Sequence, residues 1–155
     1  MINLTSTTTV KTASIKMLAY GQAGSGKTSL IPTLPTPVIL SAEGGLLSIS
    51  GHDIPSKQFE SVAIDSISEV AEVCLGAEKA IAKDPRQAYG EMQTTMAEVI
   101  RTFRDLDKHV LMTAKLEKSQ DEMGRILYAP SMPGNKTGQA LPYYFDIVAA
   151  LRVEK

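Results

Sequence analysis

Short apolar runs alternate with amphipathic segments along most of this chain. In two segments, 66–83 and 89–107, the apolar residues recur near the 3.6-residue period of a helix. Continuous apolar runs are typical of strands that are buried on both faces of a parallel sheet, with helices packed against it. The pattern therefore predicts an α/β fold with a mostly parallel sheet, whose strands are expected at 15–20, 38–42, 61–65, 110–114 and 147–151.

The segments between these elements are shorter or more polar. Residues 28–31 open a helix that the prolines at 32, 35 and 37 keep short. Residues 115–138 are polar, with one short strand candidate at 125–128, and a short helix is expected near 139–145. The Thr- and Ser-rich residues 1–14 predict a flexible arm or an edge strand. Residues 15–155 are expected to form a single domain.

A glycine-rich motif follows the first predicted strand. It fits the phosphate-binding pattern G-x-x-x-x-G-K-[ST] at every fixed position. Backbone N–H groups at a strand–loop–helix junction converge on a polyphosphate, whereas the alternative is a glycine-rich turn with a solvated lysine. We predict that nucleotide is bound by Gly21, Gln22, Ala23, Gly24, Ser25, Gly26, Lys27, Thr28 and Ser29.

A site of this kind also needs a cation for the phosphates and oxygen ligands for Mg²⁺. Lys27 would reach the β- and γ-phosphates, and the Thr28 hydroxyl would bind Mg²⁺. A carboxylate at the end of a neighbouring strand is needed to hold the metal through water. Asp65 ends the apolar run 61–65 and is the predicted second magnesium residue.

Hydrolysis also requires a group that activates water. Glu43 ends the apolar run 38–42 and is the predicted catalytic residue together with Lys27. The alternative for Glu43 is a solvated acid at the start of a Gly-Gly turn. Glu69 lies in the helix after Asp65 and is the second choice.

Taken together, these motifs resemble those of RecA-like ATPases. The segments 88–92, 108–114 and 141–146 further resemble phage-encoded nucleotide-binding proteins linked to single-strand-annealing recombination. The resemblance implies a three-layer RecA-like core in which strand 110–114 lies between the P-loop strand and the Asp65 strand. It also implies that Thr113 or Lys115 senses the γ-phosphate.

The same resemblance bears on partners. Residues 115–138 fall where RecA-like recombinases hold a DNA-contacting loop. Besides Lys115, its cations are Lys118, Arg125 and Lys136, which are the candidate DNA contacts, and three acids in the segment offset part of this charge. Single-stranded DNA, a homo-oligomer (ring or filament) and a phage recombination or single-strand-binding protein are the implied partners. The alternative for the segment is a solvated hairpin.

Composition narrows the function class. The 155 residues carry 43% hydrophobic and 21% charged side chains with a net charge of −1, which excludes a uniformly basic nucleic-acid binder. One cysteine permits no internal disulfide. No apolar run reaches the ~20 residues of a membrane span, and no signal-peptide pattern is present. The expected location is the cytoplasm of a bacterial host cell.

Two functions remain open at this point. The first is a Mg-dependent ATPase that acts on single-stranded DNA in phage recombination or annealing. The second is a nucleotide-dependent switch or binding module for a protein partner, with little turnover. A small-molecule kinase is disfavoured because no cluster of lid arginines occurs. The guanine-reading stretch Asn-Lys-x-Asp is also missing, which favours ATP.

Overall fold

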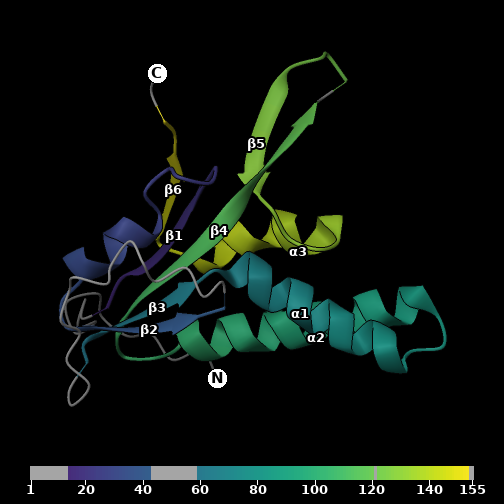
Figure 1. Ribbon diagram of the computed structural model, residues 1–155, viewed down its shortest axis with the longest axis horizontal. Coiled ribbons are helices and arrows are strands. Elements are labelled where there is room, and N and C mark those ends of the chain that lie inside the picture. The colour runs from purple at the N-terminus through teal and green to yellow at the C-terminus, as the bar shows by residue number, and fades with distance from the viewer. Residues whose placement is uncertain (1–13, 43–58, 121, 154–155) are drawn as a thin grey trace, which may run out of the picture.

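The computed structural model describes residues 14–42, 59–120 and 122–153, except for the side chains of residues 135 and 136 (Figure 1). Its elements in chain order are β1 (Lys16–Gly21), η1 (Thr28–Thr33), β2 (Pro37–Ser41), β3 (Ser61–Asp65), α1 (Ile67–Ile81), α2 (Pro85–Arg104), β4 (His109–Gln120), β5 (Ile126–Pro130), α3 (Asn135–Ala140), η3 (Leu141–Tyr144) and β6 (Ile147–Leu151).

A parallel sheet forms the centre of the described chain. Its strand order is β2-β3-β4-β1-β6, and β5 pairs with β4 outside this path. All pairs within the ordered path are parallel, and only β4 and β5 are antiparallel. The strand that holds 110–114 therefore lies between the P-loop strand and the Asp65 strand, as the resemblance to RecA-like ATPases implies.

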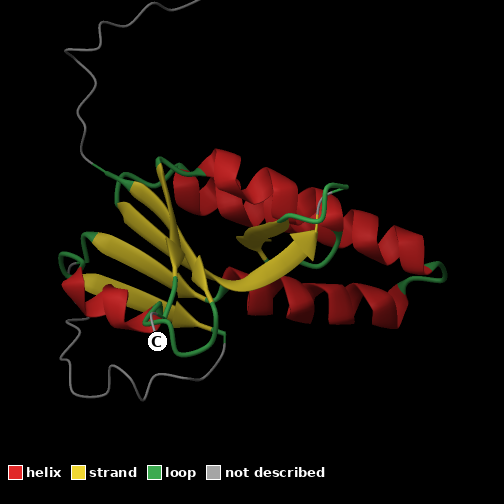
Figure 2. Ribbon diagram, turned by 90° about the horizontal axis from the view of Figure 1, so that it is seen from above, coloured by secondary structure: helices red, strands yellow, loops and turns green. Residues whose placement is uncertain are grey.

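The two faces of the sheet bury different partners. Leu18 and Met112 pack in a cluster with residues of α1 and α2. The next residue in β1, Ala19, lies instead in a cluster with Leu111 and with Ile31 of η1. Successive side chains of a strand point to opposite faces, so α1 and α2 cover one face and η1 the other. The expected three-layer α/β class is confirmed, and Figure 2 shows the long helices extending beyond the sheet.

Several element boundaries differ from the prediction. The strand predicted at 38–42 is not buried on both faces: β2 is at one end of the described sheet, and Leu40 is 47% exposed. The second long helix begins at Pro85 rather than at 89. Asp84 caps it by accepting a hydrogen bond from the N–H of Arg86, and proline is well tolerated in a first turn. The pair Asp84-Pro85, which follows the end of α1, thus also begins α2.

The segment predicted as a polar loop is mostly a β-hairpin. β4 continues to Gln120 and pairs with β5 in an antiparallel ladder from Leu116↔Pro130 to Gln120↔Ile126. This hairpin projects away from the body of the sheet (Figure 1). The expectation of a loop over 115–138 was therefore wrong, and the alternative of a hairpin is the one observed.

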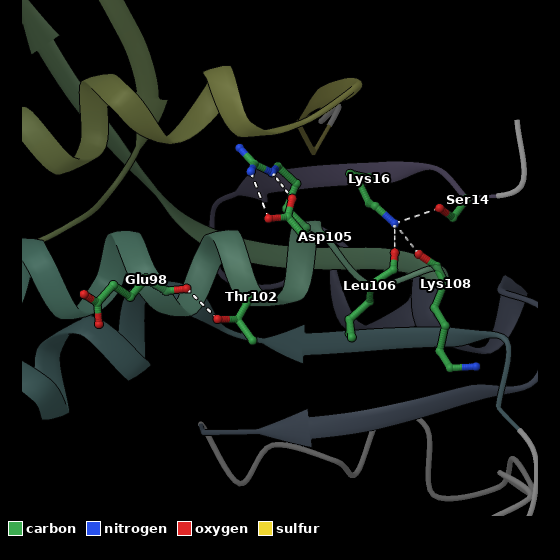
Figure 3. Close-up of polar contacts among 8 residues, drawn as sticks. Ser14, Lys16, Glu98, Thr102, Asp105, Leu106 and Lys108 are labelled. Carbon is green, nitrogen blue, oxygen red and sulfur yellow. Dashed lines mark hydrogen bonds and ion pairs between the residues drawn. The ribbon is translucent and has the colours of Figure 1, made fainter. Parts of the chain in front are cut away.

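The amino-terminal edge of the sheet is held by a buried lysine. Lys16 Nζ donates hydrogen bonds to Ser14 Oγ at 2.9 Å, to the Leu106 carbonyl at 2.7 Å and to the Lys108 carbonyl at 2.5 Å (Figure 3). The backbone N–H of Lys16 donates to Asp146 Oδ2 at 2.8 Å. These contacts join β1 to the turn between α2 and β4 and to the start of β6. None of the helices within the described ranges is both long and apolar enough to cross a membrane.

Candidate nucleotide site

The glycine-rich motif lies at the carboxyl end of β1, an interior strand between β4 and β6. Gly21 ends β1 and is the register partner of Lys115 on β4 and of Leu151 on β6. The loop then leads into η1, whose first residue is Thr28. Ligands of open α/β sheets bind at this edge, where the loops after neighbouring strands converge.

The glycines of the loop serve two different purposes. Gly24 and Gly26 have φ values of 75° and 84°, a conformation that disfavours any residue with a Cβ. Gly21 is required by close packing instead, because a Cβ there would lie 2.4 Å from Ser25 Oγ and 2.7 Å from the Leu151 carbonyl oxygen. Unlike Gly24 and Gly26, Gly21 is not among the glycines of the described chain that have a positive φ.

Lys27 folds back over the loop that precedes it. Its Nζ donates hydrogen bonds to the carbonyl oxygens of Gly21 at 3.1 Å and of Gln22 at 2.9 Å. These are weak partners for an ammonium group compared with a phosphate. The ammonium group therefore lies beside the backbone of the loop and can exchange these carbonyl partners for a phosphate.

Asp65 forms the centre of the site. Thr28 Oγ1 donates to Asp65 Oδ2 at 2.8 Å, and Thr113 Oγ1 donates to Asp65 Oδ1 at 2.5 Å. Asp65 is 3% exposed and Thr113 is fully buried. A buried carboxylate with two hydroxyl groups around it is an oxygen-only donor set, which suits a hard cation such as Mg²⁺. The residues present thus fit the metal that a P-loop nucleotide site uses.

Two buried hydroxyl groups in this region lack a hydrogen-bond partner within the described part of the chain. They are Oγ of Ser25, in the glycine-rich loop, and Oγ of Ser41, at the end of β2. Ser41 is the register partner of Asp65, so both lie at the same edge of the sheet. Buried polar atoms are nearly always satisfied, and unsatisfied ones point to a missing ligand or water. Ser41 is not among the residues predicted for this site from the sequence, and its only sequence signal is its place at the end of an apolar run.

The two candidates for sensing the γ-phosphate have different partners in the structure. Thr113 contacts Asp65, as described above. Lys115 instead places its Nζ 2.7 Å from Glu69 Oε2 and 3.0 Å from Glu72 Oε1, both on α1. The hydrogen bonds to Glu69 and then Glu72 raise the pKa of Lys115. Glu69, the second choice for activating water, is thus engaged in an ion pair.

The predicted DNA-contacting cations do not lie on one loop. Lys118 is in β4, opposite Tyr128 of β5, and Arg125 directly precedes β5. Residue 136 belongs to α3, and its side chain lies outside the described residues. Glu43, the predicted catalytic residue, also lies outside the described residues. Lys118 and Arg125 therefore belong to the hairpin, whereas Lys136 belongs to a separate helix.

One comparison with known proteins agrees with this site. A family model described as an AAA domain matches residues 13–155. No curated protein matches the sequence. One similar solved structure is that of a KaiC-like protein from the hyperthermophilic archaeon Pyrococcus horikoshii, with 12% identity, a TM-score of 0.32, and coverage of 80% of this chain and 88% of that chain. This likeness is too distant to bear on function. Because the family match spans the P-loop, Asp65 and the hairpin, the chain belongs to the AAA domain family of P-loop ATPases.

Proposed function

We propose that this protein binds Mg·ATP at the P-loop and hydrolyses it. The observation that carries the proposal is the buried carboxylate of Asp65, held by the hydroxyl groups of Thr28 and Thr113 beside a complete P-loop. Mg²⁺ would be held by Thr28 directly and by Asp65 through water, and it would neutralise charge on the phosphates. Lys27 would exchange its two carbonyl partners for the β- and γ-phosphates.

The water-activating role is assigned to Glu43. It stands two positions beyond Ser41 in the sequence, and Ser41 is the register partner of Asp65 on the neighbouring strand. Glu69 is less suited to this role because its carboxylate accepts a hydrogen bond from Lys115.

We further propose that the ATPase acts on single-stranded DNA in phage recombination or annealing, as a homo-oligomer. The motif resemblance supports this assignment. So does the hairpin, which carries Lys118 and Arg125 on an element that projects from the sheet. Cations that contact backbone phosphates are a usual means of binding a single strand. A phage recombination or single-strand-binding protein is the corresponding protein partner.

A second function is a nucleotide-dependent switch for a protein partner. Two observations favour it. The hairpin exposes apolar side chains, with Met123 81% exposed and Ile126 57% exposed. Its base is also tied to the site: the Lys115 N–H donates to Ser68 Oγ, and the Ser68 hydroxyl donates to the Ser131 carbonyl. α1 begins just after Asp65, so a change at the metal site would reach the hairpin through Ser68.

The two functions are separated by a turnover assay. Phosphate release from Mg·ATP is measured with and without a single-stranded oligonucleotide, for the parent protein and for Glu43→Gln. The ATPase proposal expects turnover that DNA stimulates, and a fall of about 10²–10⁴-fold in the variant with nucleotide binding retained. Negligible turnover in the parent under both conditions, with tight Mg·ATP binding, would favour the switch. Full turnover in Glu43→Gln would move the water-activating role to another acid.

A further inference from the structure

Tyr128 on the hairpin is flanked by two cations that come from different elements. The guanidinium carbon of Arg152 lies 4.9 Å from the centroid of the Tyr128 ring. Nζ of Lys118, the cross-strand neighbour of Tyr128, lies 5.8 Å from the same centroid. Arg152 directly follows β6, so its contact with Tyr128 connects the hairpin to the far side of the P-loop strand.

This cluster lies close to the P-loop. Leu151, the residue before Arg152, is the register partner of Gly21, the first residue of the loop. β5, which holds Tyr128, also contacts β1, the strand that ends in Gly21. Because β1 lies between β4 and β6, the Tyr128–Arg152 contact crosses over the strand end from which the phosphate-binding loop departs.

Lys118 and Tyr128 of the cluster point to a different face of the hairpin from Glu117, Ser119 and Ala129. Glu117, Ser119 and Ala129 line a cavity of about 190 Å³ together with Gly138 and Gln139 of α3. Lys118 and Tyr128 alternate with these residues along their strands and so point to the opposite face of the hairpin. It is also the face on which Arg152, just after β6, lies over the Tyr128 ring.

An aromatic ring and a guanidinium group beside a phosphate site suit a nucleobase. Bases stack on aromatic side chains and on arginine planes, and such stacking depends little on base identity. We propose that Tyr128 and Arg152 form the stacking platform for the nucleobase of the nucleotide whose phosphates lie on the P-loop, with purines preferred over pyrimidines. This inference rests on the proposed nucleotide-binding function. Purines are preferred because their larger ring buries more surface against the platform.

Calorimetry with two ligands tests the platform. The affinities of Mg·ATP and of Mg·tripolyphosphate, which has no base, are measured for the parent, Tyr128→Leu, Tyr128→Phe and Arg152→Gln. Tyr128→Leu and Arg152→Gln are expected to weaken Mg·ATP binding by about tenfold, the effect of losing roughly one stacking contact. Tripolyphosphate binding is expected to stay unchanged, and Tyr128→Phe to bind Mg·ATP like the parent. Tyr143→Leu is the matched control, because Tyr143 is 91% exposed and belongs to η3 rather than to the hairpin or the P-loop.

The outcomes separate the platform from the nucleotide site itself. Equal Mg·ATP affinity in the parent and in Tyr128→Leu would overturn the platform while leaving the P-loop assignment intact. A loss confined to binding of a single-stranded oligonucleotide, with Mg·ATP affinity unchanged, would also overturn it and assign Tyr128 to DNA. A parent that binds neither phosphate ligand would overturn the proposed function and the platform together. A parent preference for ATP over CTP that disappears in Tyr128→Leu would support the platform.

Discussion

Thr113 and Asp65 are joined by a short hydrogen bond in the interior of the sheet. The Thr113 hydroxyl, in the middle of β4, donates to one carboxylate oxygen of Asp65, at the end of β3. Thr28 donates to the other oxygen. The carboxylate is therefore oriented by hydroxyl groups from two different elements, so its position depends on the fold as well as on the P-loop.

Removing the Thr113 hydroxyl should affect both stability and metal use. Thr113→Val keeps the shape of the side chain but leaves one buried carboxylate oxygen without its donor. We expect the free energy of unfolding to fall by about 1–3 kcal/mol. We also expect more Mg²⁺ to be needed for half-maximal nucleotide binding. Denaturant unfolding and a Mg²⁺ titration measure the two effects, with Thr113→Ser as the control that keeps the hydroxyl. An unshifted Mg²⁺ titration in Thr113→Val would show that Thr113 does not orient the metal site.

Lys16 should matter for folding but not for nucleotide binding. Its ammonium group donates to the carbonyl oxygens of Leu106 and Lys108 as well as to Ser14. Lys16→Met fills a similar volume but leaves both carbonyl groups without this donor. The expected loss is about 1–3 kcal/mol in the free energy of unfolding, with Mg·ATP affinity unchanged. Unaltered stability in denaturant titrations would contradict this role.

Burial also makes the contribution of Lys16 depend on pH. Desolvation lowers the pKa of Lys16 below its ordinary value of 10.5, and the carboxylates of Asp146, Asp107 and Asp105 oppose this shift. Between the lowered pKa and 10.5 the unfolded chain binds more protons at this site than the folded chain does. The free energy of unfolding should therefore gain a positive slope with pH in that window. Comparing unfolding of the parent and Lys16→Met from neutral pH up to pH 10.5 measures the difference, and identical slopes would argue against it.

The DNA proposal predicts a change in salt dependence. Replacing Lys118, Arg125 and Lys136 together with Ala should weaken binding of single-stranded DNA and make its salt slope shallower. Each lost phosphate contact removes about 0.7 from the slope of log K against log salt. Affinity measured by fluorescence anisotropy at several salt concentrations tests this. Arg86→Ala, at the start of α2, is the control. If the triple variant has the same DNA affinity and the same salt slope as the parent, the DNA proposal is contradicted and the protein-switch function is favoured.

The central sheet could be predicted because its signals are local. The run 61–65 is apolar up to Asp65, and the structure places β3 over the same residues. The hairpin could not be predicted in the same way. Glu117, Lys118, Ser119 and Gln120 are all exposed, so β4 has no apolar alternation beyond the sheet. A strand that is solvated on both faces lacks the period-two pattern on which sequence prediction depends.

In the site, too, contiguous motifs could be predicted from the sequence, whereas contacts between distant segments could not. The P-loop is a contiguous motif, and its residues are found from sequence alone. The sequence left Thr113 and Lys115 as equal sensor candidates, because their partners come from β3 and α1. The contact between Arg152 and Tyr128 likewise joins β6 to the hairpin and carries no local signal. Pairings between distant segments depend on strand order, which the apolar pattern does not specify.

Binding of Mg·ATP by Lys27→Ala shows whether the glycine-rich loop is the nucleotide site. The variant removes the ammonium group that now contacts the carbonyl oxygens of Gly21 and Gln22 and would otherwise contact the phosphates. Isothermal titration calorimetry should show that most of the parent's affinity for Mg·ATP is lost, while the thermal unfolding midpoint without nucleotide stays close to that of the parent. Unchanged Mg·ATP affinity together with unchanged hydrolysis would contradict the assignment of this loop as the nucleotide site.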